Sequence, residues 1–117
     1  MGFGIAVDSS TNVYATGSTT SPNFNTTNAL FKSLNGSATD AFVIEFGSTG
    51  TTVAFSTYFG GTGSEDLLTG AIAVDTAATP NIYITGDTNS SSGFPTKSAV
   101  QGSFGGGADA FVAKITP

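Results

Sequence analysis

Two adjacent acidic residues, Glu65 and Asp66, end a glycine-rich stretch that could do chemistry. Residues 60–66 read Gly-Gly-Thr-Gly-Ser-Glu-Asp, which is close to the Gly-Gly-x-Gly-x-Asp calcium repeat. Calcium takes several oxygen ligands, and carboxylates and backbone carbonyls supply them. That calcium fold needs tandem copies, whereas this stretch occurs once, with its acid shifted by one residue. Glu65 and Asp66 are therefore weak calcium candidates, a plain loop is the favoured interpretation, and no other cofactor is expected.

Most residue types that enzymes use for acid–base or nucleophilic chemistry are missing. A glycosidase holds two carboxylates several Å apart on opposite sides of the scissile bond, which neighbours on one glycine loop rarely achieve. The sequence contains no His and no Cys, and its three basic residues are all Lys. This excludes Ser-His catalysis, a cysteine nucleophile and an arginine clamp on a substrate carboxylate. The chain is predicted not to be an enzyme, and a hydrolase acting through Glu65 and Asp66 is the weakest alternative.

The charge balance excludes two classes of partner. The formal net charge is −5, and only 9% of residues are charged, against about 25% in an average soluble protein. Phosphate binding depends on clustered Lys and Arg, so neither a nucleic acid nor an anionic membrane surface is expected as a partner. No apolar run approaches about 18 residues, so no membrane span is predicted.

Four aspartates lie at the ends of predicted strands. Asp8 and Asp75 each follow a first strand, and Asp40 and Asp109 each open a third strand. A carboxylate in such a place accepts backbone N–H bonds and fixes a tight turn, which is the structural role we expect. A ring of these aspartates around a central channel, holding a cation, is the alternative.

Aromatic and asparagine side chains offer further candidate sites. Tyrosines could stack on sugars, but aromatic residues on strands more often belong to a core or an assembly surface. The candidates for that role are Tyr14, Phe42, Tyr83 and Phe111. Three Asn-x-Ser/Thr sequons could carry glycans, at Asn25, Asn35 and Asn89, although chance alone supplies such sequons in a chain rich in Asn, Ser and Thr.

Much of the first half of the sequence recurs in the second half as an internal repeat. Three motifs recur in the same order: Gly-Ile-Ala-Val-Asp at 4–8 as Ala-Ile-Ala-Val-Asp at 71–75, Asn-Val-Tyr-Ala-Thr-Gly at 12–17 as Asn-Ile-Tyr-Ile-Thr-Gly at 81–86, and Asp-Ala-Phe-Val at 40–43 as the same residues at 109–112. A shared period with small slips indicates one structural unit used twice, with insertions confined to loops.

Short apolar and β-branched runs between turn residues predict an all-β fold of antiparallel strands. The first unit, residues 1–66, has four such runs, near 4–8, 12–17, 40–46 and 52–59. The second unit, residues 67–117, has three, near 71–75, 81–86 and 109–115, and lacks the outer strand. Residues 28–34 could form one helical turn in the first long connection, with Gly36 ending it.

Four short strands per repeat, stacked radially, are typical of a β-propeller blade. Five motifs fall in order along the chain: Gly-Ile-Ala-Val-Asp, Asn-Val-Tyr-x-Thr-Gly-Ser-Thr, Phe-x-Thr-x-x-Ala, Asp-Ala-Phe-Val and Ser-Thr-Tyr-Phe-Gly-Gly. Together they resemble the bacterial and archaeal SBBP β-propeller repeat over nearly all of the chain. The resemblance implies an extracellular or cell-surface protein with many such blades and no catalytic residues to carry over. The chain departs from the family pattern in having fewer than two full repeats and an Ala-Ala-Thr-Pro turn at 77–80.

Two adjacent blades share one interface and leave two outer faces bare, on which we expect Phe42, Phe111, Tyr14 and Tyr83. Exposed apolar faces indicate a partner. We therefore predict a non-catalytic structural, self-assembling module that pairs with copies of itself or with further blades of a longer chain.

The geometry of such an assembly has simple limits. Two blades per chain close a ring of four, six or eight blades from two, three or four chains, and a contact that does not close gives a filament. The alternative function is a glycan- or protein-binding module that acts through the long loops 18–39 and 87–108.

Overall fold

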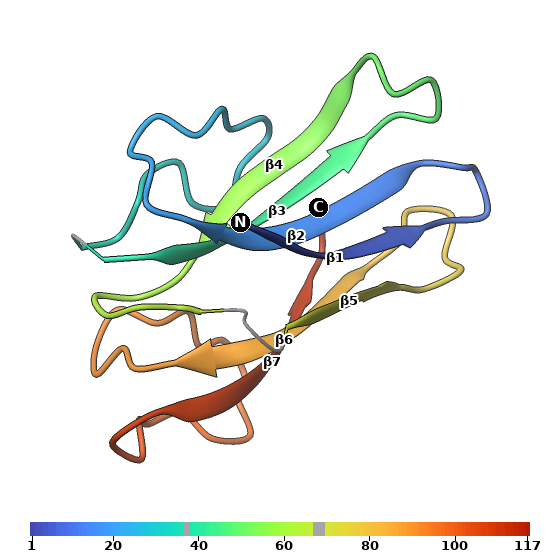
Figure 1. Ribbon diagram of the computed structural model, residues 1–117. Coiled ribbons are helices and arrows are strands. Elements are labelled where there is room, and N and C mark those ends of the chain that lie inside the picture. Colours follow the sequence, from blue (N-terminus) through green and yellow to red (C-terminus); the bar gives the residue numbers. More distant parts are fainter. Residues whose placement is uncertain (37, 67–69) are drawn as a thin grey trace.

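The computed structural model describes residues 1–36, 38–66 and 70–117. Its seven strands form two antiparallel sheets, and no helix occurs within those ranges (Figure 1). The predicted all-β fold of four strands followed by three is therefore confirmed. The predicted boundary between the units falls at Leu67, which lies outside the described residues, as do Leu68 and Ser37.

The first sheet, called blade 1 below, is a meander in which each strand pairs with the next. It consists of β1 (Gly2–Val7), β2 (Val13–Thr19), β3 (Asp40–Phe46) and β4 (Val53–Phe59), in that order. Val, Ile, Phe, Tyr and Thr fill these segments, and such residues favour a pleated, half-buried surface.

The second sheet, blade 2, repeats the meander without its last member. It consists of β5 (Ala71–Val74), β6 (Ile82–Thr88) and β7 (Asp109–Ile115). Among the described residues β7 is paired with β6 on one side, and no strand lies along its other edge.

The helical turn expected over residues 28–34 is wrong. This part of the chain runs along β4 instead, where Thr27 forms a two-way backbone bridge with Ser56. The Phe31 N–H donates to the Thr57 hydroxyl at 2.9 Å, and Asn28 has a left-handed φ of 51°. Because the open edge of β4 satisfies these backbone groups, the segment does not need a local helix to do so.

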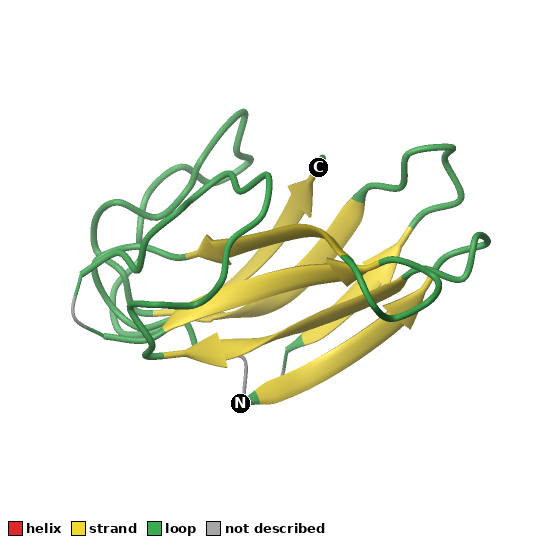
Figure 2. Ribbon diagram, turned by 90° about the horizontal axis from the view of Figure 1, so that it is seen from above, coloured by secondary structure: helices red, strands yellow, loops and turns green. Residues whose placement is uncertain are grey.

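The two blades pack face to face, with β1 and β5 side by side (Figure 1). The long connections gather at one end of the strands and the tight hairpin turns at the other (Figure 2). One buried cluster joins the two sheets; it comprises Tyr14, Ala41, Val43, Phe55, Phe59, Ile82, Ile84, Phe111 and Ile115. The core of the molecule is therefore the junction between the blades.

One pair of equivalent valines allows a matched test of this packing. Val43 is fully buried in the junction, whereas Val112, at the same place in the second repeat, is 81% exposed. We expect Val43→Ala to lower the free energy of unfolding by about 2 kcal/mol, because it leaves a cavity. Val112→Ala should change it by less than about 0.5 kcal/mol in dilute solution. Urea denaturation of both variants checks this. Equal losses in the free energy of unfolding would show that Val43 does not lie in a packed junction.

Candidate functional site

The inner faces of the two blades, which meet at the junction, follow from the strand registers. In blade 1 the register aligns Ala6, Tyr14 and Glu45 across three strands, and Gly4, Thr16 and Val43 in the next row. In blade 2 it aligns Ile72, Ile84 and Ala113, and then Val74, Ile82 and Ile115. A Cβ placed on Gly4 would stand 3.1 Å from Ile72 Cγ2, so β1 and β5 touch at this point.

The outer faces of the two blades have no second sheet packed against them among the described residues. That of blade 1, defined as Ile5, Val7, Val13, Ala15, Ile44 and Phe46, is entirely apolar. Its most exposed members are Ile5 at 71% and Val7 at 56%. That of blade 2 is defined as Ala71, Ala73, Tyr83, Thr85, Val112 and Lys114. Each blade therefore has one covered face and one uncovered face.

The sequence repeat relates these four faces in a specific way. Aligning the repeated motifs places Ile5 with Ile72, Val13 with Ile82 and Phe46 with Ile115. The outer face of blade 1 thus corresponds to the inner face of blade 2. By the same alignment, Tyr83 corresponds to Tyr14 and Val112 to Val43. The outer face of blade 2 thus corresponds to the inner face of blade 1, so the two uncovered faces hold the counterparts of the two faces that meet in the junction.

The structure divides the four aromatic candidates between these surfaces. Tyr14 and Phe111 were expected on outer faces, but both are buried in the junction. Phe42 lies on the outer side of blade 1, where the Phe24 ring covers it at a centroid distance of 5.1 Å. Tyr83 lies on the outer face of blade 2. The sequence did not predict the burial of Tyr14 and Phe111, because both faces of each sheet carry apolar residues. Periodicity alone does not tell which of the two faces is covered.

The two equivalent tyrosines differ in their polar partners. The Tyr14 hydroxyl lies 3.0 Å from Asp8 and 3.1 Å from Glu45, and burial followed by these acids raises its pKa. The Tyr83 hydroxyl lies 3.2 Å from Asp75. Lys114 replaces Glu45 in the second repeat, and its ammonium lies 5.8 Å from the centre of the Tyr83 ring. Tyr83, on the uncovered face, therefore has a cation beside it, whereas the buried Tyr14 has an acid in the same place.

Asp8 and Asp75 lie in the β1–β2 and β5–β6 turns. Asp8 accepts hydrogen bonds from the backbone N–H groups of Ser10 and Asn12, at 2.8 and 2.9 Å, and from the Asn12 amide. Desolvation raises the pKa of Asp8, but these bonds and that from Tyr14 outweigh it, leaving the pKa lowered. Asp75 makes the matching set, led by two bonds from Asn81, which lower its pKa to about 2. Both carboxylates act as ionised acceptors that organise a turn.

Glu65 is fully buried where the chain passes from blade 1 to blade 2. Its Oε2 accepts the Gly61 N–H at 2.9 Å, and its Oε1 accepts the hydroxyls of Thr88 and Ser90. Its own N–H donates to the Thr39 carbonyl at 2.7 Å. The carboxylate thus ties loop 60–66 to the end of β6. Nothing in the sequence indicates this role, since an acid in a glycine-rich loop looks like a surface residue.

Asp40 is the second buried acid of this region, and its surroundings are incomplete. Its Oδ2 accepts the Asn35 N–H at 2.9 Å, whereas Oδ1 has no hydrogen-bond partner among the described residues. Both carboxyl groups border Gly60: a Cβ there would stand 2.7 Å from Asp40 Oδ1 and in direct conflict with Glu65 Oε2. Burial raises the pKa of Asp40 to about 6, the Asn35 bond opposes this, and the charge of Glu65 adds to it. Asp109, the counterpart in blade 2, accepts the Gly105 N–H at 2.6 Å.

The remaining candidates lie apart from one another. Asp66 is exposed while its neighbour Glu65 is buried, so the two acids do not face one site. The described residues contain no group of three or more His, Cys, Asp or Glu that could hold a metal ion. Calcium binding at Glu65 and Asp66 stays a prediction.

The sequon asparagines have different surroundings. Asn25 is exposed, Asn35 is half-buried, and Asn89 is exposed with its Oδ1 accepting the Ser64 N–H at 2.7 Å.

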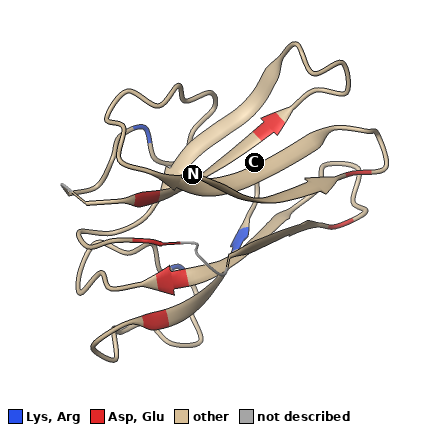
Figure 3. Ribbon diagram, viewed as in Figure 1, with Lys and Arg blue, Asp and Glu red and all other residues tan. Residues whose placement is uncertain are grey.

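Charged residues gather in loops and near strand ends (Figure 3). Within the part of the chain that the structure describes, no helix could span a membrane.

The two antiparallel meanders of four and three strands, with their repeated faces, are consistent with β-propeller-like blades. A family model described as a β-propeller repeat, SBBP, matches residues 2–25. The resemblance drawn from the sequence is therefore confirmed over that segment, which covers β1, β2 and the start of the first long loop. No curated protein and no solved structure matches the chain.

The Asp40 carboxyl makes stability depend on pH. Its folded pKa of about 6 lies above the ordinary value of 3.8, so the folded chain retains a proton that the unfolded chain releases. Stability should therefore fall by about 3 kcal/mol as the pH rises from about 4 to about 6, and then level off.

The conservative amide variant tests this directly. Asp40→Asn keeps an acceptor for Asn35 and cannot ionise beside Glu65, so it should remove this slope and be the more stable protein at pH 7.5. Urea denaturation between pH 4 and pH 8 measures both. If the Asp40→Asn variant shows the same pH dependence of the free energy of unfolding as the wild type, another group causes that dependence.

Proposed function

We propose that the chain is a non-catalytic structural repeat module that assembles head to tail through its blade faces. The outer face of blade 2 of one copy docks on the outer face of blade 1 of the next. The observation that carries this proposal is the correspondence of faces: over the first three strands of each blade, the uncovered pair holds the positional counterparts of the pair that already packs inside the chain.

The contrast in exposure gives the driving force. Val43 is fully buried in the internal junction, and its counterpart Val112 is 81% exposed. Ile5 is 71% exposed, while its counterpart Ile72 packs against the core. Burial of apolar surface contributes about 25 cal/mol per Å², so covering a whole blade face on each partner favours association.

The contact is heterologous, because the two docking faces differ. Such contacts generate a closed ring when the rotation between copies closes, and an open filament when it does not. A ring would hold four, six or eight blades from two, three or four copies, within the range that propellers adopt. Further blades of a longer polypeptide would satisfy the same faces in the same way.

The proposed setting is extracellular or at a cell surface. It is supported by the SBBP match at residues 2–25, by the low charge, and by the presence of sequons. The alternative of a ligand-binding module acting through both long loops finds less support. The first loop lies on β4, with the Phe24 N–H donating to the Tyr58 hydroxyl at 2.9 Å, so it is part of the blade.

Charged substitutions on either outer face test the assembly. Ile5→Lys and Val112→Lys each place an ammonium in a face that must be buried, and both side chains point outward, so the fold is retained. Sedimentation velocity at micromolar concentration should show wild-type species above the 11.6 kDa of one chain. Each variant alone should sediment as a single chain, and Ser48→Lys, in the exposed β3–β4 turn, should behave as wild type.

Mixing the two variants distinguishes head-to-tail from face-to-like-face contact. Ile5→Lys retains an intact blade 2 face, and Val112→Lys retains an intact blade 1 face. An equimolar mixture should therefore form a dimer that grows no further. A wild-type chain that stays monomeric, or a mixture that shows no dimer, contradicts the proposal.

A further inference from the structure

Two buried carboxyl groups border the same glycine where the chain leaves blade 1. Asp40, at the start of β3, is 1% exposed, and Glu65, in loop 60–66, is fully buried. A side chain on Gly60 would collide with Asp40 Oδ1 and with Glu65 Oε2. Because glycine has no side chain, the two acids can approach each other at this point.

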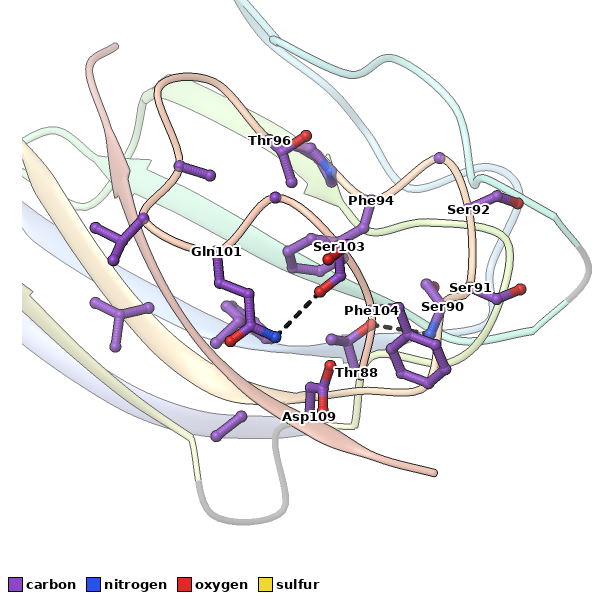
Figure 4. Close-up of a pocket in the computed structure, with 18 residues that line it drawn as sticks. Thr88, Ser90, Ser91, Ser92, Phe94, Thr96, Gln101, Ser103, Phe104 and Asp109 are labelled. Carbon is purple, nitrogen blue, oxygen red and sulfur yellow. Dashed lines mark hydrogen bonds between the residues drawn. The ribbon is translucent and has the colours of Figure 1, made fainter. Parts of the chain in front are cut away.

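Glu65 is held in place by donors from both repeats. Its Oε1 accepts the hydroxyls of Thr88 and Ser90 at 2.6 and 2.5 Å, and its Oε2 accepts the Gly61 N–H at 2.9 Å. The Ser90 N–H also donates to the Thr88 hydroxyl at 3.0 Å, which fixes these two side chains at the end of β6 (Figure 4). A carboxylate has about four acceptor positions, so one position, on Oε2 beside Gly60, remains for a further contact.

Asp40 lacks a partner for one of its oxygens. Its Oδ2 accepts the Asn35 N–H at 2.9 Å, whereas Oδ1, the oxygen that borders Gly60, has no hydrogen-bond partner among the described residues. A buried polar atom in this state has lost its hydration without compensation. The nearby charge of Glu65 adds to the cost of ionising Asp40. A positive ion between Oδ1 and Oε2 would compensate both acids.

The spacing of these two oxygens suits a calcium ion. Calcium binds oxygen ligands at about 2.3–2.6 Å, so one ion can bridge two oxygens that lie up to about 5 Å apart. The contacts that both atoms make with the Cβ position of Gly60 place them within that limit. Magnesium demands a near-ideal octahedron, whereas calcium accepts irregular geometry. Calcium therefore fits better between two carboxylates whose orientation other hydrogen bonds already fix.

A cavity of about 320 Å³ gives an ion access to this place. Asp40 and Gly60 line it together with residues 30–35 of the first long loop. Lys32 is among these residues, but it is exposed. The cavity has room for several water molecules, which calcium commonly retains among its six to eight oxygen ligands.

We propose that Asp40 and Glu65 bind one calcium ion through Asp40 Oδ1 and Glu65 Oε2, with water from the cavity completing the coordination shell. Asp66 is not part of this site, because it is exposed while Glu65 is buried. Asp40 belongs to blade 1, and Glu65 is bonded to the end of β6 in blade 2. The ion would therefore stabilise the connection between the blades.

Thermal unfolding and NMR test the site with calcium chloride as the probe. After treatment with EDTA and dialysis at pH 7.5, about 10 mM CaCl₂ should raise the Tm of the wild-type chain by about 5 °C. The same concentration of MgCl₂ should raise it by less than about 1 °C. In an NMR titration of Ile5→Lys, used so that self-association does not interfere, the amide signals of Gly60 and Gly61 should shift saturably, with a dissociation constant of about 0.1–1 mM.

Four conservative variants locate the ion. Asp40→Asn and Glu65→Gln each keep the size of the side chain and remove its charge, so each should abolish the calcium-dependent rise in Tm. Asp66→Asn alters the exposed neighbour, and Asp109→Asn alters the counterpart of Asp40 in blade 2. Both should respond to calcium as the wild type does. Asp40→Asn is expected to be the more stable protein without calcium, so its loss of response cannot be due to unfolding.

Several results would overturn the proposal. They are a wild-type Tm that calcium does not change, an equal rise with magnesium, an equal calcium response in Asp40→Asn and the wild type, or a response that Asp66→Asn abolishes. If Glu65→Gln does not fold, Asp40→Asn and the NMR titration still decide. Failure of head-to-tail assembly leaves these measurements intact, because the site lies inside one chain.

Discussion

A blade with two apolar faces needs a neighbour on each side, and this constraint governs the whole molecule. Blade 1 covers the inner face of blade 2 and is covered by it, so the chain completes one junction by itself. The cluster that includes Tyr14, Val43, Ile82 and Ile115 is both the core of the protein and the interface between its repeats. The stability of the fold therefore depends on this contact between the repeats, and the proposed association would use the same kind of surface.

In the proposed head-to-tail assembly, the internal junction would serve as the template for the contact between copies. Because the outer faces correspond to the inner faces in reverse, a copy that docks head to tail meets a surface like one it already contains. The differences are informative. Lys114 stands in the second repeat where Glu45 lies beside Tyr14, so the proposed contact between copies would carry a cation near Tyr83. It would differ from the internal junction in these polar groups and share its apolar residues.

The sequence predicted the parts of the fold that rest on local pattern. Repeated motifs located the strands, and Asp8 and Asp75 stand where turn chemistry needs a carboxylate. It failed where the outcome depends on what covers a surface. Tyr14 and Tyr83 occupy the same position of the repeated motif. Only Tyr14 is buried, because only its face of the sheet meets another blade.

Long-range packing also explains the other differences from expectation. Residues 28–34 are loop because they pair with β4, which is far away in the sequence. The Tyr58 N–H donates to the Phe31 carbonyl, and the Thr57 hydroxyl accepts the Phe31 N–H. Glu65 is buried because Thr88 and Ser90 meet it from the second repeat.

Engineered disulfides offer the most direct test of head-to-tail docking, and the natural chain has no cysteine to interfere. Gly4 touches Ile72 in the internal junction, and the corresponding residues of the outer faces are Ala71 and Ile5. Mild oxidation of a mixture of Ala71→Cys and Ile5→Cys chains should give linked heterodimers faster than either variant gives homodimers. Linkage no faster in the mixture than in the separate variants would contradict the account.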